Sequence, residues 1–290
     1  MFAGVQALIT EHAGDAFLPY SMEQIHATLI AFNGVRDPDG GGAIVNEYYL
    51  EHTGVRRTMD VDLAMWVLAE RFGRPLPIRV GGYRAGDEVP FRSRGQHLYE
   101  RTFSVQASPG QQGAFVLVGW PTEAGLPLHR LRRDLNAAGL LHRYHARDDD
   151  VDGDMHIVVG HHRGASEDVL RGAVTAVREA LAAGPVSFDI GLGDVKVVAA
   201  DNHTLNPPLY VGSVPVDAST VLGLAVSLLL GPPDVTQVGC VFLVAAAVGA
   251  VRDGEPVPFV EALGADLLGL DRISVHIRAG EPDRHARTNQ

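Results

Sequence analysis

Alternating and helical patterns of apolar residues divide the chain into strands and helices. From Ile25 to Ala31 the side chains of an extended chain alternate between two faces, and His26 and Thr28 fall on the same face. From Asp60 to Phe72 apolar residues recur at the spacing of one helix face, and Gly73 follows as a stop signal. The pattern therefore predicts a strand that carries a histidine and a threonine side by side, and a helix after it.

The same reasoning predicts further elements downstream. Strands are expected at 76–81, 98–106, 114–120, 155–160, 186–190 and 195–199, and helices at 128–141 and 166–183. One order of elements occurs twice: a strand that carries a histidine, then a helix, then a strand that begins after a glycine and a proline. The first copy contains His26 and the second contains His156. This repeat predicts two similar lobes that face each other across a pseudo-twofold cleft, each offering one histidine.

One segment interrupts the first half of this repeat. Residues 33–59 contain the turn-forming run Asp37 to Gly42 and then a polar, aromatic stretch that includes Tyr48. Long insertions in a compact domain are commonly active-site covers or disordered loops. We treat 33–59 as a candidate lid insertion and Tyr48 as a candidate accessory residue of the site.

The net charge and the cysteine content limit which ligands and which cellular compartment are expected. The formal net charge is −11, and Lys196 is the only lysine among 24 basic residues. Binding to a long duplex draws on clustered cations, so a small nucleotide or an RNA end is the better candidate ligand. Cys240 is the single cysteine, which excludes a disulfide within the chain, and the N-terminus has no signal-peptide pattern. These features predict a cytoplasmic protein.

The C-terminal third differs in composition from the rest. Residues 1–210 are expected to form the main domain, 211–279 an apolar helical appendage and 280–290 a disordered tail. Gly231 to Asp234 divide the apolar region 220–251 into two runs, each shorter than the roughly 20 residues that a membrane-spanning helix needs. Two buried or dimer-forming helices are favoured over a membrane hairpin, so we expect no membrane association and a homodimer as one role for the appendage.

Two short motifs carry the strongest functional signal. The segment Ile25-His26-Ala27-Thr28-Leu29 resembles the His-x-Thr/Ser-hydrophobic motif of the two-histidine (2H) phosphoesterases, which include 2′-5′ RNA ligase-like and cyclic nucleotide phosphodiesterase proteins. Asp154-Met155-His156-Ile157-Val158 is the second candidate, and the resemblance covers roughly residues 2 to 206. It implies an α+β fold in which two antiparallel-sheet lobes surround a central cleft, with helices on the outside.

The chemistry of such a pair follows from its residue types. At neutral pH one histidine can take a proton from an attacking hydroxyl or water while the other gives one to the leaving oxygen. Thr28, on the face of His26, can donate to a phosphate oxygen. Val158 stands where the resemblance expects Thr or Ser, and it has no donor. Arg163 is a candidate phosphate-binding residue that could compensate, and His161, His162 and Arg101 are candidate accessory residues. Arg79 and His203 are further candidates for this role.

Other chemistries have weaker support. The acidic run Asp148 to Gly153 opens like an EF-hand calcium loop, but Val159 occupies the place of the bidentate glutamate. The histidines between 142 and 162 lack a zincin motif, so we expect no metal and no cofactor. The leading hypothesis is a metal-independent phosphodiesterase acting on a cyclic phosphate or a 2′-5′ linked nucleotide or RNA end. The alternatives are a catalytically impaired protein that binds a nucleotide and an interaction or assembly protein.

Overall fold

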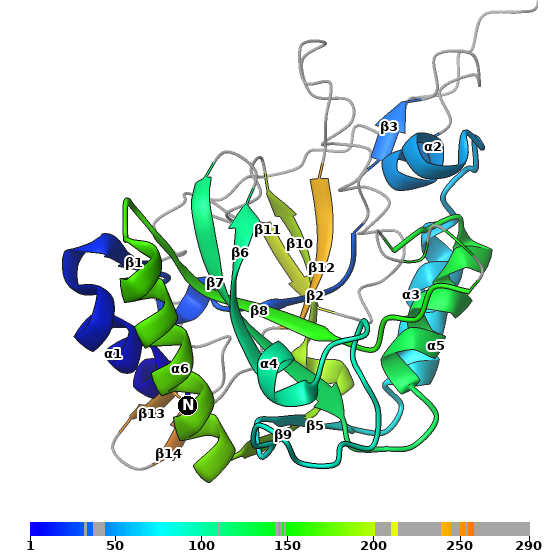
Figure 1. Cartoon of the computed structure of the whole chain (residues 1–290). Helices are drawn as coiled ribbons and strands as arrows, with labels where there is room; N and C mark the ends of the chain where they lie inside the picture. The colour runs from blue at the N-terminus through cyan, green and yellow to red at the C-terminus, as the bar shows by residue number, and fades with distance from the viewer. Residues whose placement is uncertain are drawn as a thin grey trace, which may run out of the picture. The chain divides into compact units, whose positions relative to one another are not determined.

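A computed structural model describes residues 1–31, 34–36, 44–108, 111–142, 145, 147, 149–200, 210–213, 239–244, 250–252 and 255–257. Its contacts divide the chain into two units, Met1–Val248 and Gly249–Gln290. In the second unit, strands β13 (Ala250–Arg252) and β14 (Glu255–Val257) pair as an antiparallel hairpin. All other described elements belong to the first unit, which carries both histidine motifs (Figure 1).

Helices and strands alternate irregularly along the first unit. The helices are α1 (Phe2–Ala13), α2 (Glu47–Thr53), α3 (Val61–Arg71), α4 (Leu98–Thr102), α5 (Pro127–Asp134) and α6 (Glu167–Ala183), and short 3-10 turns span Gly14–Ala16, Met22–Gln24, Leu135–Ala138 and Leu192–Asp194. The strands are β1 (Phe17–Pro19), β2 (Ala27–Ala31), β3 (Gly34–Arg36), β4 (Ile44–Asn46), β5 (Leu76–Val80), β6 (Phe103–Ser108), β7 (Gln111–Pro121), β8 (Met155–His162), β9 (Val186–Ile190), β10 (Val195–Ala200), β11 (Tyr210–Ser213) and β12 (Gly239–Val244).

Ten of these strands form one antiparallel sheet that curls into a half-barrel. Its main path runs β11-β10-β12-β2-β8-β7-β5-β9, while β1 pairs with β8 and β6 pairs with β7. Strand β8 lies in the middle and pairs with β2 on one side and β7 on the other (Figure 1). The mixed, mainly antiparallel architecture confirms the predicted α+β class.

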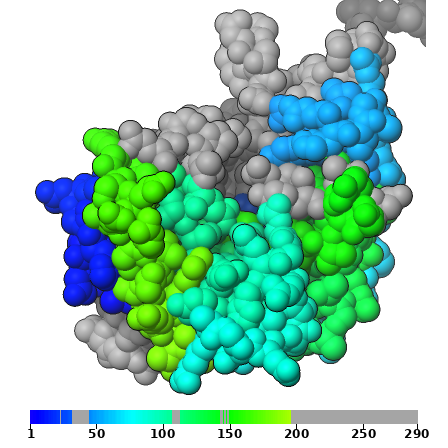
Figure 2. Space-filling model, in the orientation of Figure 1, coloured from blue at the N-terminus to red at the C-terminus, as the bar shows by residue number. Residues whose placement is uncertain are grey.

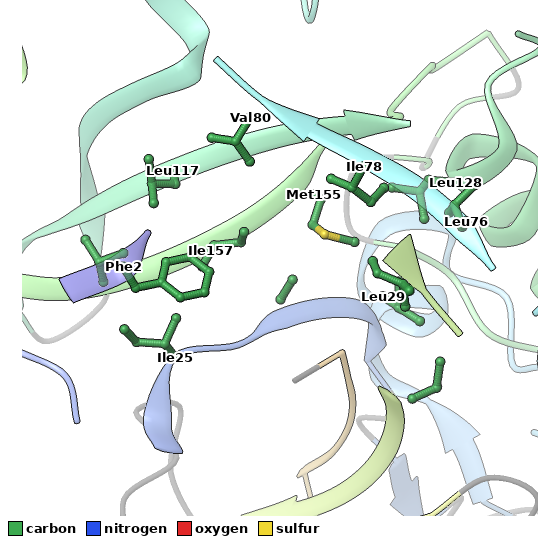
Figure 3. Packing of buried hydrophobic residues seen from close by; sticks show 14 of the residues in the cluster. Phe2, Ile25, Leu29, Leu76, Ile78, Val80, Leu117, Leu128, Met155 and Ile157 are labelled. Carbon is green, nitrogen blue, oxygen red and sulfur yellow. The ribbon is translucent and has the colours of Figure 1, made fainter. Parts of the chain in front are cut away.

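One face of the sheet packs against the helices and forms the main core. Apolar residues of α1, α3, α5 and α6 meet Leu29 of β2, Leu117 of β7 and Ile157 of β8, all fully or almost fully buried. Figure 3 shows this layer from close by. Burying one such side chain contributes about 1.5–3 kcal/mol. The layer therefore holds β2 and β8 at a fixed place in the fold.

Helix α6 illustrates how the sequence builds this layer. The Ser166 hydroxyl accepts the backbone N–H of Val169 and caps the first turn. Ala173, Val177 and Leu181 follow at intervals of four residues, and all three are buried in the main core. The helix thus covers the sheet with one apolar stripe, as the periodicity predicts.

The opposite face of the sheet carries a second, smaller apolar cluster. Val116, Val118 and Trp120 of β7 are buried there with Leu98 of α4, and Val158 of β8 packs against them. The loop between β5 and α4 contributes partly buried residues that cover this cluster, namely Tyr83, Val89 and Phe91. In Figure 2 this loop and α4, in cyan, form the surface between α6 and α5. Polar side chains of β2 and β8 lie on the same face as this cluster.

Several sequence predictions need correction. The predicted strand 98–106 begins as helix α4 and becomes β6 at Phe103, and the predicted helix 128–141 ends at Asp134 and continues as a 3-10 turn. Helix α1 was not predicted. Residues 239–244 of the predicted helical appendage form β12, which pairs with β10 and β2. A short apolar run fits a buried strand as well as a buried helix, so periodicity alone could not separate them.

The candidate lid insertion is described only in part. Gly34–Arg36 and Ile44–Asn46 pair as an antiparallel hairpin, and α2 follows directly. The turn-forming run 37–42 lies outside the described residues, as do the tail 280–290 and most of 211–279. Within the described ranges, no helix is both long enough and apolar enough to cross a membrane.

Candidate functional site

The register of β2 and β8 brings the two histidine motifs together. Ala27, between His26 and Thr28 in the first motif, pairs with Ile157, between His156 and Val158 in the second. Ala27–Ile157 is the one pair recorded between β2 and β8, and His26 directly precedes β2. A regular antiparallel ladder continued by one residue on each side of this pair would set Thr28 opposite His156 and His26 opposite Val158. Side chains that are directly opposite stand about 5 Å apart and diagonal ones about 7 Å apart. In such a ladder the two histidines would be a diagonal pair.

Thr28, His156 and Val158 lie on the face of the sheet that carries the second apolar cluster and α4, and His26 directly precedes β2. Ala27 and Ile157 are fully buried in the main core, and their neighbours along each strand must point the other way. His26, Thr28, His156 and Val158 are correspondingly only partly buried. The shared surface of His26, Thr28 and His156 stays a prediction, and the pairing of Ala27 with Ile157 is the observation that supports it.

A short turn fixes the ring of His26. Met22–Gln24 form a 3-10 turn in which the Gln24 side chain accepts the Ser21 backbone N–H at 3.0 Å. The turn places the Gln24 carbonyl 2.5 Å from Nδ1 of His26, and because a carbonyl only accepts, Nδ1 carries the proton. Nε2 of the neutral ring then offers a lone pair. Burial lowers the pKa of His26 to about 4, against the opposing effect of the Gln24 carbonyl.

Asp154 organises the surroundings of His156. Its Oδ1 accepts the Ser93 hydroxyl at 2.5 Å and the Trp120 indole N–H at 2.7 Å, and its Oδ2 accepts Nε of Arg101 at 3.0 Å. The carboxyl is buried, which by itself raises its pKa. The interaction with His156, the hydrogen bond from Ser93 and the charge of Arg101 outweigh this, so the pKa of Asp154 is lowered. The group is a fixed anion beneath the site.

Arg101 contacts the functional nitrogen of His156. Its Nη2 lies 2.7 Å from Nε2 of His156, while Oδ2 of Asp154 is 3.5 Å from the same nitrogen. A guanidinium only donates, so Nε2 accepts this bond and the imidazole is neutral. Burial lowers the pKa of His156, the nearby Asp154 carboxylate opposes this by favouring the protonated ring, and the charge of Arg101 lowers the pKa further. The ring keeps 23% of its side-chain surface exposed, so it remains accessible.

Arg132 is a residue of the site region that the sequence reasoning missed. It is buried at 2% exposure, and its guanidinium donates to the carbonyls of Leu29, Asp152 and Asp154 at 3.0–3.1 Å and to that of Thr28 at 3.4 Å. These carbonyls belong to β2 and to the approach to β8. Arg132 therefore joins the two motif strands beyond their single ladder pair. The sequence signal for a buried Arg132 was its position within the apolar stripe of the predicted helix 128–141.

The remaining predicted residues are spread over the fold. Arg163 is exposed just beyond β8, seven residues from His156, a path of up to about 23 Å along a strand. His161 pairs with Ala114, on the face of the second cluster, and its Nε2 lies 2.7 Å from the Tyr20 hydroxyl. His162 packs against Phe115 on the core side. The structure thus does not bring Arg163 or His162 to the histidine pair.

Two further predicted residues can be placed. Tyr48 lies on α2, with its ring 5.9 Å from that of His52. Arg79, on β5, donates to the Gly82 carbonyl at 3.3 Å and stacks over Tyr83. His203 lies outside the described residues.

A second group of histidines surrounds the end of α5. Nδ1 of His129 is 3.2 Å from Nε2 of His145, and Nδ1 of His142 is 3.7 Å from Oδ2 of Asp152. Asp152, part of the acidic run that opens like a calcium loop, also lies 3.7 Å from Arg132. Over the described part of the chain, no three His, Cys, Asp or Glu side chains are arranged to hold a metal ion.

Comparisons with protein-family models, with curated proteins and with solved structures found no match. The likeness to the 2H phosphoesterases consequently stays a prediction that rests on the residues of the two motifs.

Proposed function

We propose that this chain is a metal-independent phosphodiesterase of the 2H type that acts on a cyclic phosphate or on a 2′-5′ linked nucleotide or RNA end. The observation that supports this most directly is the pairing of Ala27 with Ile157, because a ladder with this register has His26, Thr28 and His156 on one face. A phosphate group bound there has a histidine on either side and a hydroxyl donor beside His156.

The same register supports the predicted pseudo-twofold relation. Where the central residues of two antiparallel motifs pair, a half-turn about an axis through that pair exchanges the motifs. His26 then exchanges with His156, and Thr28 with Val158. Two lobes related by this axis, each giving one histidine to the cleft between them, are part of the proposal.

In the proposed reaction, His26 is the general base. Its Nδ1–H is held by the Gln24 carbonyl, so the lone pair of Nε2 is the one presented to water. Nε2 takes a proton from water as the water oxygen attacks phosphorus. The bond from phosphorus to one ring oxygen of a 2′,3′-cyclic phosphate breaks, and that oxygen takes a proton from His156. One water is consumed and a phosphate monoester is formed, with Thr28 donating to a non-bridging oxygen.

His156 must be protonated to act as the acid. In the free protein it accepts a hydrogen bond from Arg101, and burial favours the neutral ring. A bound phosphate adds a negative charge, which together with the Asp154 carboxylate at 3.5 Å favours the imidazolium. We therefore assign the proton uptake of His156 to the substrate-bound state.

Two specific observations favour a second function. Nε2 of His156 is already engaged by Arg101, and Val158 lacks a donor next to His26. Loss of one such donor costs about 10²- to 10³-fold in rate. A protein that binds a nucleotide without converting it fits these two facts, and it predicts ligand-induced stabilisation without turnover.

The test is an activity assay in EDTA with 2′,3′-cyclic mononucleotides, 3′,5′-cyclic nucleotides and 2′-5′ dinucleotides. His26→Ala and His156→Ala are expected to lose about 10²- to 10⁴-fold in kcat each. His12→Ala, which removes an exposed histidine of α1, is the control and should keep full activity. The enzyme proposal fails if no substrate is turned over. If one of these nucleotides then stabilises the wild type against heat and His26→Ala abolishes that stabilisation, the nucleotide-binding function is supported instead.

A further inference from the structure

We infer that Arg101 is the anion-binding residue of this site, and that it donates to a non-bridging phosphate oxygen when the substrate displaces it from His156. This inference rests on the proposed function for the location of the phosphate. It assigns to a side chain of α4 the charge stabilisation that a hydroxyl at position 158 would otherwise provide.

The position of Arg101 is set by fixed contacts. Its side chain is 8% exposed, and both Nε and Nη2 lie 3.0 Å from Oδ2 of Asp154. Asp154 is held in turn by Ser93 and Trp120, at 2.5 Å and 2.7 Å. A guanidinium anchored in this way loses little conformational entropy when a ligand arrives. The contacts made by Asp154 thus aim Arg101 at His156 before any substrate binds.

The contact with His156 defines where an anion would meet Arg101. Nη2 donates to Nε2 at 2.7 Å, so it occupies the place that a substrate oxygen takes when it approaches that nitrogen. When the leaving ring oxygen takes this place beside His156, a non-bridging oxygen of the same phosphate comes within reach of the displaced guanidinium. The guanidinium is always charged, and its bonds to anionic oxygens are roughly twice as strong as those between neutral groups.

Arg101 differs from the other buried arginine of the region in one decisive respect. Arg132 directs its nitrogens at main-chain carbonyls of Thr28, Leu29, Asp152 and Asp154, and so acts on the backbone. Arg101 instead contacts a side chain that is partly exposed on the open face. The arrangement of Arg101 is that of a ligand-binding cation, and the arrangement of Arg132 is that of a backbone clamp.

The experiment compares Arg101→Gln and Arg101→Lys with Arg178→Gln. Arg178 on α6 donates to the main-chain carbonyls of Glu100 and Phe103, so its loss disturbs the same α4 region without removing the cation at His156. KM for 2′,3′-cyclic nucleotides and Kd for inorganic phosphate, measured by thermal stabilisation, should rise about 10- to 100-fold in Arg101→Gln. In Arg178→Gln both constants should stay within about twofold of wild type.

The outcomes separate this inference from the proposed function. Turnover by wild type with unchanged KM, kcat and phosphate Kd in Arg101→Gln would overturn the inference and leave the enzyme intact. If the wild type binds phosphate without turning over any substrate, the proposed enzymatic activity is wrong. If that binding is lost in Arg101→Gln but kept in Arg178→Gln, the inference about Arg101 is upheld. If wild type binds neither phosphate nor a cyclic nucleotide, both fail. Should Arg101→Gln not fold, Arg101→Lys is expected to fold and to weaken phosphate binding, and unchanged binding would contradict the inference.

Discussion

At position 158 a valine occupies the place of the hydroxyl residue that the 2H resemblance leads one to expect, and its surroundings explain why valine is stable there. Val158 is partly buried and packs against the second apolar cluster, opposite Val116 of β7. A threonine in this place would set a hydroxyl against apolar neighbours, at a cost of about 1 kcal/mol for a partly exposed site. Packing against β7 favours valine at this position, whereas the catalysis proposed beside His26 would favour a hydroxyl residue.

Restoring the hydroxyl should increase activity at the expense of stability. Under the proposed function, Val158→Thr adds a donor next to His26 and is expected to raise kcat on a 2′,3′-cyclic nucleotide about 10- to 100-fold. The free energy of unfolding, measured in urea, should fall by about 1 kcal/mol. Val158→Ala is the control, because it reduces the packing without adding a donor. A threonine variant no faster than the alanine variant would show that position 158 takes no part in the reaction.

At the scale of elements, the two motif strands meet over a very short ladder. One pair, Ala27 with Ile157, joins β2 and β8, and Arg132 of α5 then spans the carbonyls on either side. A guanidinium has five N–H groups in a rigid fork, whereas a lysine ammonium has three donors at a single point. The spacing of the two histidine motifs thus depends on a side chain from a third element.

Replacing this clamp should separate the motifs and destabilise the fold. Arg132→Lys leaves buried carbonyls without donors and is expected to lower the free energy of unfolding by about 3 kcal/mol. Its neighbour Arg133 donates to the carbonyls of Arg147 and Asp150 at the surface, so Arg133→Lys should cost less than about 1 kcal/mol. Equal losses in urea denaturation of the two variants would contradict the role of Arg132 as a clamp.

Sequence patterns predicted the elements that carry the motifs better than the contacts between them. The strands at 25–31 and 155–160 follow from alternation, and the shared face of His26 and Thr28 follows from the two-residue period. The network of Asp154, Arg101 and Arg132 joins residues 22 to 104 positions apart, and no local pattern encodes such a separation. Strand β12 was missed for a related reason, because only pairing with β2 and β10 distinguishes it from a helix.

At the scale of the whole molecule, buried neutral histidines couple folding to pH. Burial lowers the pKa of His26 to about 4 and that of His145 to about 3, and Arg132 and Arg133 add to the effect at His145, where His129 also lowers the pKa and Asp150 opposes it. In the unfolded chain each histidine has a pKa near 6.5. Between these values the unfolded state binds protons that the folded state does not, so stability is complete above pH 6.5 and decreases as the pH falls toward 4.

Acid stability therefore tests the burial of His145. Asp154, whose pKa is lowered by folding, loses its stabilising contribution only as the pH falls below about 4, so the histidines dominate the window from 6.5 to 4. His145 alone should cost on the order of 3 kcal/mol across that window. Urea unfolding at half-unit pH steps measures the slope, and His145→Gln should reduce it by about 1.4 kcal/mol per pH unit, the equivalent of one proton. An unchanged slope would mean that His145 is protonated in the folded chain. The close arrangement of His129, His142 and His145 beside two arginines would then be wrong, because a further positive charge there would be repelled by the arginines.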